Sequence, residues 1–175
     1  SVRGPHHIAE GLPNQDAWAK FHHVWGDGIV VSDGVGSKPF SSFGSDAACL
    51  AVELAVLTCC PDGEIERNSL FSSIQANWLR LVAPLEPRDC AATCLFALRL
   101  DGVIHIGMLG DGLAALVKSD GSVVSLSENK TQGFSNITTA LSANVSAKDW
   151  QYLSLSAEQC IAVLLCTDGV ADDLD

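Results

Sequence analysis

The spacing of hydrophobic residues changes twice along this 175-residue chain. Alternating, strand-like runs come first, a helical spacing follows, and alternating runs return in the second half. Strands and helices are therefore grouped, whereas a parallel β-α-β fold requires them to alternate. This order favours an α+β fold with antiparallel sheets.

The first half of the chain predicts a hairpin and then two helices. Residues 17–25 and 29–32 are typical of strands, and Asp27-Gly28 between them is a common hairpin turn. Apolar residues then recur at helical spacing over residues 47–57. A second amphipathic helix is predicted after Asn68, which we expect to be its N-cap.

The second half predicts an antiparallel meander. Asp101-Gly102 and Asp120-Gly121 are expected to be hairpin turns between its strands. A polar, irregular segment, an edge element and a buried strand complete the chain. The expected strands are 90–100, 103–109, 113–118 and 122–126, followed by the loop 128–150, the edge element 152–155 and the buried run 161–166.

Composition excludes several classes of protein. With 47% hydrophobic and 18% charged residues, the chain is expected to form one compact domain over residues 1–175. A net charge of -11 argues against binding to nucleic acid or to anionic membranes. The longest apolar stretch, 47–60, is interrupted and too short to span a bilayer.

The cysteines indicate a reducing compartment. There are seven, an odd number, and none form a C-x-x-C pair, so we expect free thiols, which are usual in the cytoplasm. The chain begins without an apolar leader segment, which supports the same expectation.

Asp-Gly dipeptides are the main chemical signal in the chain. For any one of them a turn is the simplest interpretation. Three differ because an apolar or strand-like run precedes them, as in Val31-Ser32-Asp33-Gly34 and Cys166-Thr167-Asp168-Gly169. A buried strand that ends in a carboxylate needs a reason, because such a charge is costly unless it is paired or binds a metal. The seven dipeptides begin at Asp27, Asp33, Asp62, Asp101, Asp111, Asp120 and Asp168.

These carboxylates suit a hard divalent cation. Magnesium and manganese prefer oxygen ligands, usually a few carboxylates with water. Glycine beside the aspartate lets a cation approach the backbone, and its carbonyl is a further ligand. Asp33, Asp111 and Asp168 are therefore candidate ligands, and Asp16, just before the first strand, is a fourth acidic candidate.

Five segments of the chain together resemble the type 2C metal-dependent serine/threonine protein phosphatases, and most closely their bacterial branch. They occur in the order and rough spacing of that family's motifs and extend over essentially the whole chain. The segments are Asn14-Gln15-Asp16-Ala17, Val31-Ser32-Asp33-Gly34-Val35-Gly36, Ala91-Ala92-Thr93, Leu109-Gly110-Asp111-Gly112 and Thr167-Asp168-Gly169-Val170.

The resemblance implies both a fold and a site. It implies a four-layer α-β-β-α sandwich, in which helices flank two antiparallel sheets and metals bind at one end. Asp33 would bridge two Mn²⁺ or Mg²⁺ ions, the Gly34 carbonyl would bind one of them, and Asp168 the other. Asp16 would orient water, and Asp111 would contribute to a third, weaker metal position.

The chain also departs from the family pattern. Gly11 stands where many members carry a phosphate-binding arginine, so Arg3, His6 or His7 would have to replace it. The family continues beyond Asp168 through a helix to a last strand with another metal-binding aspartate. We therefore expect the C-terminal part of the family's domain, and one ligand, to lie beyond this chain.

Three functions remain open at this point. The first is metal-dependent hydrolysis of phosphoserine or phosphothreonine on proteins by a monomer in bacterial signalling, with phosphoprotein substrates and a cognate kinase as partners. The second is a weakly active or inactive member that binds or regulates. The third is an acidic α+β domain in which every Asp-Gly pair is a turn, which would leave Asp33 and Asp168 far apart.

Overall fold

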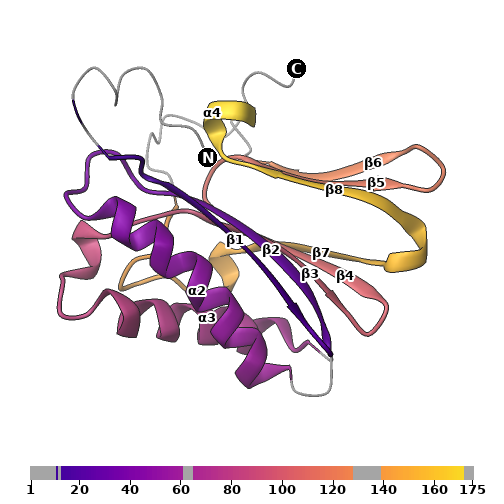
Figure 1. The fold of residues 1–175 in the computed structure, drawn as a ribbon, viewed down its shortest axis with the longest axis horizontal. Coiled ribbons are helices and arrows are strands. Elements are labelled where there is room, and N and C mark those ends of the chain that lie inside the picture. Colours follow the sequence, from indigo (N-terminus) through magenta and orange to yellow (C-terminus); the bar gives the residue numbers. More distant parts are fainter. Residues whose placement is uncertain (1–10, 12, 61–64, 128–138, 172–175) are drawn as a thin grey trace.

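The fold is a sandwich of two antiparallel sheets in a computed structural model that describes residues 11, 13–60, 65–127 and 139–171 (Figure 1). The five-stranded sheet has the order β1-β2-β3-β4-β7, and the three-stranded sheet has the order β6-β5-β8. This arrangement confirms the predicted α+β class. The strands are β1 (Asp16–His23), β2 (Gly26–Asp33), β3 (Cys94–Leu100), β4 (Val103–Leu109), β5 (Leu113–Lys118), β6 (Val123–Ser127), β7 (Gln151–Ser156) and β8 (Cys160–Cys166).

Two helices cover one face of the five-stranded sheet. They are α2 (Ser41–Cys59) and α3 (Arg67–Val82). α2 starts six residues before the predicted apolar run, and α3 is capped by Glu66 rather than by Asn68. The Glu66 carboxylate accepts hydrogen bonds from the backbone N–H groups of Asn68 and Ser69, which satisfies donors that a helix start leaves free. The remaining short helical elements are α4 (Asp168–Ala171), η1 (Pro87–Asp89), η2 (Ala147–Asp149) and η3 (Ala157–Gln159).

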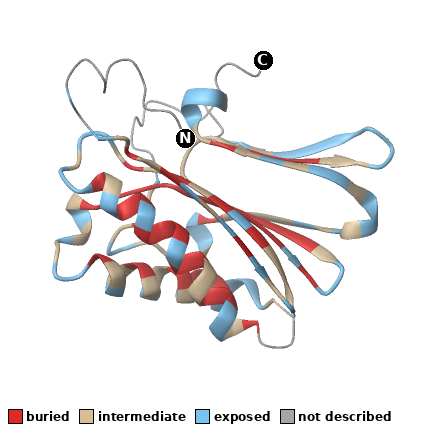
Figure 2. Ribbon diagram, in the orientation of Figure 1, coloured by how far each residue is buried: buried red, intermediate tan, exposed pale blue. Residues whose placement is uncertain are grey.

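The two faces of the five-stranded sheet line two separate cores (Figure 2). One core lies between the sheet and the helices and includes Trp78 and Phe96. The other lies between the two sheets and includes Leu95 and Leu116. Alternate residues of β3 point into different cores, because side chains along a strand alternate between its faces. By length and hydropathy alone α2 could span a membrane, but here it is a core helix packed on β1, β2 and α3.

The first hairpin turns earlier than the sequence predicts. Its turn is at Val24 and Trp25, so the predicted Asp27-Gly28 turn is wrong, and both residues lie inside β2. Gly28 pairs across the sheet with Phe21, whose ring would lie 2.1 Å from a Cβ atom at position 28. Glycine is needed at this position because the aromatic ring covers it. At Asp101-Gly102 the predicted turn is confirmed, with φ angles of 43° and 73°.

The predicted meander is divided between the two sheets. β4 pairs with β3 and β7, whereas β5 pairs with β6 and β8. The chain changes sheets at Gly110 and Gly112, whose φ angles are 109° and 113°. Only glycine adopts such values readily, so these residues permit the sharp change of direction.

The last predicted strand is less buried than expected. β8 forms an edge of the three-stranded sheet, and Ile161 and Leu164 remain 67% and 44% exposed. Val163 and Leu165 face the core between the sheets, and Cys166 is buried. The run 161–166 was predicted to be buried, and this is wrong for its outer face, which no other described element covers.

Candidate metal centre

Asp16 and Asp33 form a cross-strand pair at one end of the five-stranded sheet. Asp16 is the first residue of β1, Asp33 is the last of β2, and the antiparallel register places them opposite each other. Two like charges at such a pair destabilise a sheet unless something compensates them. The hairpin thus brings together two of the acidic residues that the sequence identified.

The backbone around Asp33 is held by Thr93. The Asp33 N–H group donates to the Thr93 hydroxyl at 2.9 Å, and the Thr93 N–H group donates to the Asp33 carbonyl at 2.8 Å. The buried Ser32 hydroxyl donates to the Thr93 carbonyl at 2.5 Å. These three bonds fix the end of β2, so the Asp33 side chain leaves from an ordered backbone.

A second set of bonds holds the residue before Asp16. The Gln15 carbonyl accepts from the Gly34 N–H group at 3.0 Å and from the buried Ser45 hydroxyl at 2.6 Å. Gly34 itself is pressed against the start of α2, since a Cβ atom there would lie 2.6 Å from the Ser41 carbonyl oxygen. Glycine is therefore required at position 34 because the backbones pack closely there. Its φ angle is not positive, so backbone conformation is not the reason.

Asp168 comes to the same place from the other sheet. It follows β8 and begins α4, where its carboxylate accepts a hydrogen bond of 2.7 Å from the Gly169 N–H group. The Asp33 carboxyl is within hydrogen-bonding reach of both Asp16 and Asp168. Two strand ends far apart in the sequence therefore meet, which excludes the interpretation in which these Asp-Gly pairs are unrelated turns.

This convergence shifts the protonation of Asp33. Burial raises its pKa most, and the neighbouring Asp16 and Asp168 raise it further, to about 8. A carboxyl surrounded in this way favours its neutral form unless a cation compensates the charge. The donors are hard oxygens, the kind that Mg²⁺ and Mn²⁺ prefer.

The carboxylates are of the right chemical type to bind a divalent cation, but their number is too small to complete its coordination. Within the part of the chain that the structure describes, no three His, Cys, Asp or Glu side chains are arranged to hold an ion by themselves. Backbone carbonyls and water would have to complete the coordination, as is usual for Mg²⁺. Gly34, beside Asp33, is the carbonyl that the sequence proposes for this task.

Asp111 lies in the loop that joins β4 to β5. A Cβ atom at Gly110 would lie 2.6 Å from Thr93, and one at Gly112 would lie 2.5 Å from the Cys166 carbonyl oxygen. The loop is therefore packed against the neighbours of both Asp33 and Asp168. Asp111 itself is half-buried.

The predicted phosphate-binding residues cannot be placed. Arg3, His6 and His7 lie outside the described residues, as does the predicted Asp62 turn. Gly11, where many family members carry an arginine, is exposed and has a φ of 69°.

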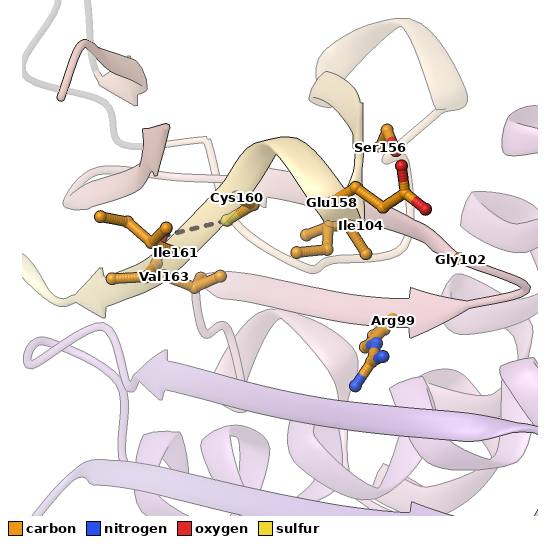
Figure 3. Close-up of a pocket in the computed structure, with 10 residues that line it drawn as sticks. Arg99, Gly102, Ile104, Ser156, Glu158, Cys160, Ile161 and Val163 are labelled. Atoms are coloured by element: carbon orange, nitrogen blue, oxygen red, sulfur yellow. Dashed lines mark hydrogen bonds between the residues drawn. The ribbon is translucent and has the colours of Figure 1, made fainter. Parts of the chain in front are cut away.

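Two cavities lie at opposite ends of the sandwich. One of about 370 Å³ adjoins the carboxylates and is lined by Asp16, Trp18 and Thr167, among others. Another of about 650 Å³ lies at the far end, between the β3–β4 turn and the start of β8 (Figure 3). Its charged lining residues are Arg99 from β3 and Glu158 from η3, so it has one carboxylate and no acidic cluster. The candidate centre is therefore at the first end.

Sequence reasoning gave Thr93 and Ser45 no role. Thr93 lies in a matched segment, but only the fold shows that it bonds to both backbone groups of Asp33. Ser45 lies 30 residues from its partner Gln15, and no local pattern signals such a bond.

The sequence matches the model of the protein phosphatase 2C family over residues 3–175. The chain belongs to this family. No curated protein matches the sequence significantly.

Solved structures of family members share the fold. A bacterial serine phosphatase has a TM-score of 0.64 at 18% identity, with 91% of this chain and 74% of that chain covered. The catalytic domain of the serine threonine protein phosphatase PstP, in complex with two manganese ions, has a TM-score of 0.56 at 17% identity, with 91% and 73% covered. RsbX in complex with magnesium has a TM-score of 0.56 at 14% identity, with 82% and 61% covered. The chain therefore spans less than two thirds of the length of RsbX.

Proposed function

We propose that this chain belongs to an enzyme that hydrolyses phosphoserine or phosphothreonine on proteins with the help of divalent cations. The observation that carries the proposal is the position of Asp33, within hydrogen-bonding reach of Asp16 on its own sheet and of Asp168 on the other. The family to which the chain belongs supports the same reaction class.

The candidate ligands have distinct proposed roles. Asp33 and the Gly34 carbonyl would hold one ion, Asp33 and Asp168 a second, and Asp111 a third, weaker one. Asp16 would orient the attacking water. When bound, the ions neutralise charge on the phosphoryl group and lower the pKa of a bound water to a value near neutrality. Mn²⁺ and Mg²⁺ are equally suited to these ligands.

The chain's own contribution is to hold these groups in place. Thr93 fixes the backbone of Asp33, while Ser45 and Gly34 fix the carbonyl next to Asp16. A site whose donors are already ordered needs little reorganisation during the reaction, and this is a large part of electrostatic catalysis. The adjoining cavity beside Trp18 gives access to the carboxylates.

The proposal is tested with a phosphothreonine peptide in the presence of Mn²⁺ and of EDTA. We expect phosphate release that requires the metal and that falls at least about a hundredfold in Asp33→Asn. Asp27→Asn is the matched control, because Asp27 lies at the opposite end of the same strand. Release that persists in EDTA, or that is equal in Asp33→Asn and wild type, contradicts the proposal.

A second function is a phosphatase-fold module that binds a partner and has little activity. The incomplete set of side-chain ligands in the described part of the chain favours it. Calorimetric titration with Mn²⁺ separates the two functions. Saturable binding that is lost in Asp33→Asn supports the enzyme, whereas a folded chain that takes up no metal supports the module.

The cellular setting is proposed from the same features. Phosphoprotein substrates follow from the family, and a cognate kinase would supply them. All seven cysteines are free thiols, which supports a location in the cytoplasm. We also propose that the protein acts as a monomer in bacterial signalling.

A further inference from the structure

The outer side of α2 carries a line of exposed hydrophobic side chains. Phe43, Leu50 and Leu57 are 46%, 44% and 45% exposed, and they are spaced seven residues apart. Two turns of helix separate each from the next, so all three lie on one side of α2. We refer to these three residues as the α2 ridge.

The ridge is not needed for the internal packing of the fold. The opposite side of α2 already fills the core with small residues such as Ala48, Ala51 and Val52, all fully buried. Figure 2 shows that α2 carries both buried and exposed residues along its length. Large apolar residues in a continuous exposed line typically mark a binding surface, whereas isolated ones do not.

The charges on α2 are all negative. Asp46 is exposed on the same side, one turn from both Phe43 and Leu50. Glu53 is held by His23, whose Nε2 lies 2.9 Å from the carboxylate. The helix contains no lysine or arginine, and the whole chain has a net charge of -11. A basic partner would be attracted, and its cation could pair with Asp46.

The same charges disfavour other occupants. Two copies of this chain would bring together two strongly acidic molecules, and long-range repulsion opposes that encounter. Anionic membranes are repelled for the same reason. At a rise of 1.5 Å per residue the ridge is about 21 Å long, or about four helical turns, which matches a short helix laid along it.

We propose that the α2 ridge docks an amphipathic helix of a partner protein, with an apolar stripe flanked by lysine or arginine. Binding of this kind uses apolar anchors at helical spacing, which fit against the line of ridge side chains. The ridge starts near the candidate metal centre, since Ser41 at the start of α2 contacts Gly34. The surface does not depend on the proposed catalytic activity, because none of its residues belongs to the centre.

The test measures binding of three synthetic peptides to the whole chain in EDTA, by fluorescence anisotropy. The first is an 18-residue helix with a leucine stripe and flanking lysines. The second replaces the lysines with glutamate, and the third has the composition of the first in an order without a stripe. We expect the first peptide to bind at least about tenfold more tightly than either of the others.

Substitutions locate the binding surface. Leu50→Gln with Leu57→Gln is expected to weaken binding of the first peptide about tenfold or more, without unfolding, because both side chains are exposed. Val123→Gln is the matched control, since Val123 is 61% exposed on β6 of the other sheet, and it should leave binding within about twofold.

Three binding results would each overturn the proposal. They are failure of the lysine peptide to bind, equal binding of the peptide without a stripe, and unchanged binding to the Leu50→Gln, Leu57→Gln protein. A dimer in sedimentation that the same substitutions abolish would also overturn it, because a second copy would then cover the ridge. All of these measurements are made without metal, so they are independent of the phosphatase assay.

Discussion

Asp16 and Asp33 face each other across the β1–β2 hairpin, one strand apart, and the Asp33 carboxyl is also within reach of Asp168. The arrangement places three acidic side chains at one end of the sandwich, where Asp16 and Asp168 both make ionisation of Asp33 less favourable. This repulsion lowers the free energy of unfolding whenever Asp33 is ionised and no cation is bound. Several measurable properties of the chain depend on it.

Without metal, the stability of the fold should fall as pH rises from about 4 to about 8. An unfolded aspartate loses its proton near pH 3.8, whereas Asp33 in the fold retains it to about 8. The folded state therefore binds more protons in this window, and the free energy of unfolding falls with pH. For a difference of one proton the slope approaches about 1.4 kcal/mol per pH unit in the middle of this window. Because Asp33 is partly solvated, the pH range over which the slope applies should be narrower than the full window. Urea unfolding in EDTA at several pH values measures it. Asp33→Asn should flatten the slope and Asp27→Asn should not.

Mn²⁺ should stabilise the wild-type fold. A ligand that binds only the folded state adds about 2.7 kcal/mol at a concentration a hundred times its Kd. The thermal midpoint at neutral pH should therefore rise with Mn²⁺ in the wild type and in Asp27→Asn, but little in Asp33→Asn. An equal rise in all three proteins would show that the metal binds elsewhere.

Thr93→Val should weaken both the fold and the site. It removes the hydroxyl that accepts the Asp33 N–H bond and leaves that group without its partner, at a cost of about 1–3 kcal/mol. Thr93→Ser should retain most of the stability. The surface substitution Thr58→Val serves as control and should change the free energy of unfolding by less than about 0.5 kcal/mol. Urea unfolding measures stability, and Mn²⁺ titration measures the site.

Gly34→Ala should be much more damaging than Gly36→Ala. A Cβ atom at position 34 would lie 2.6 Å from the Ser41 carbonyl oxygen, which must move with the start of α2. Overpacking of this kind typically costs about 1–3 kcal/mol. At position 36 the nearest atom, the Gln15 side-chain oxygen, is 3.5 Å away, an ordinary contact. Comparison of the two urea midpoints tests this prediction, and equal midpoints would contradict it.

His105 should make the fold sensitive to mild acid. Burial lowers its pKa below the usual 6.5, and its Nδ1 lies 2.6 Å from the Tyr152 hydroxyl. The unfolded state then binds more protons below pH 6.5, so this group's contribution to stability is complete above that pH and is lost as pH falls. The Asp33 contribution has the opposite sign over this pH range, so the test is made in the Asp33→Asn protein, where His105→Gln should reduce the loss between pH 6.5 and 5. His22→Gln, at an exposed site, should not.

Sequence patterns predicted turns and strand bounds well where two adjacent residues are sufficient to form the turn. The Asp101-Gly102 turn is correct because both residues tolerate the positive φ angles that the turn requires. The bounds of β4 and β5 are correct because turn residues flank them directly. Asp27-Gly28 was wrong because a distant ring, that of Phe21, requires the glycine inside a strand.

Asp33, Asp111 and Asp168 could be named from the sequence, because each follows a strand-like run and precedes a glycine, whereas Asp16 was named from its place just before the first strand and in a family motif. Only the tertiary structure brought Asp16, Asp33 and Asp168 together, since that depends on strand register and on the packing of two sheets. The same is true of the Thr93 and Ser45 bonds, the division of strands between sheets and the exposure of β8. Side-chain type is a local property, whereas pairing between distant segments is decided by the free energy of the whole fold.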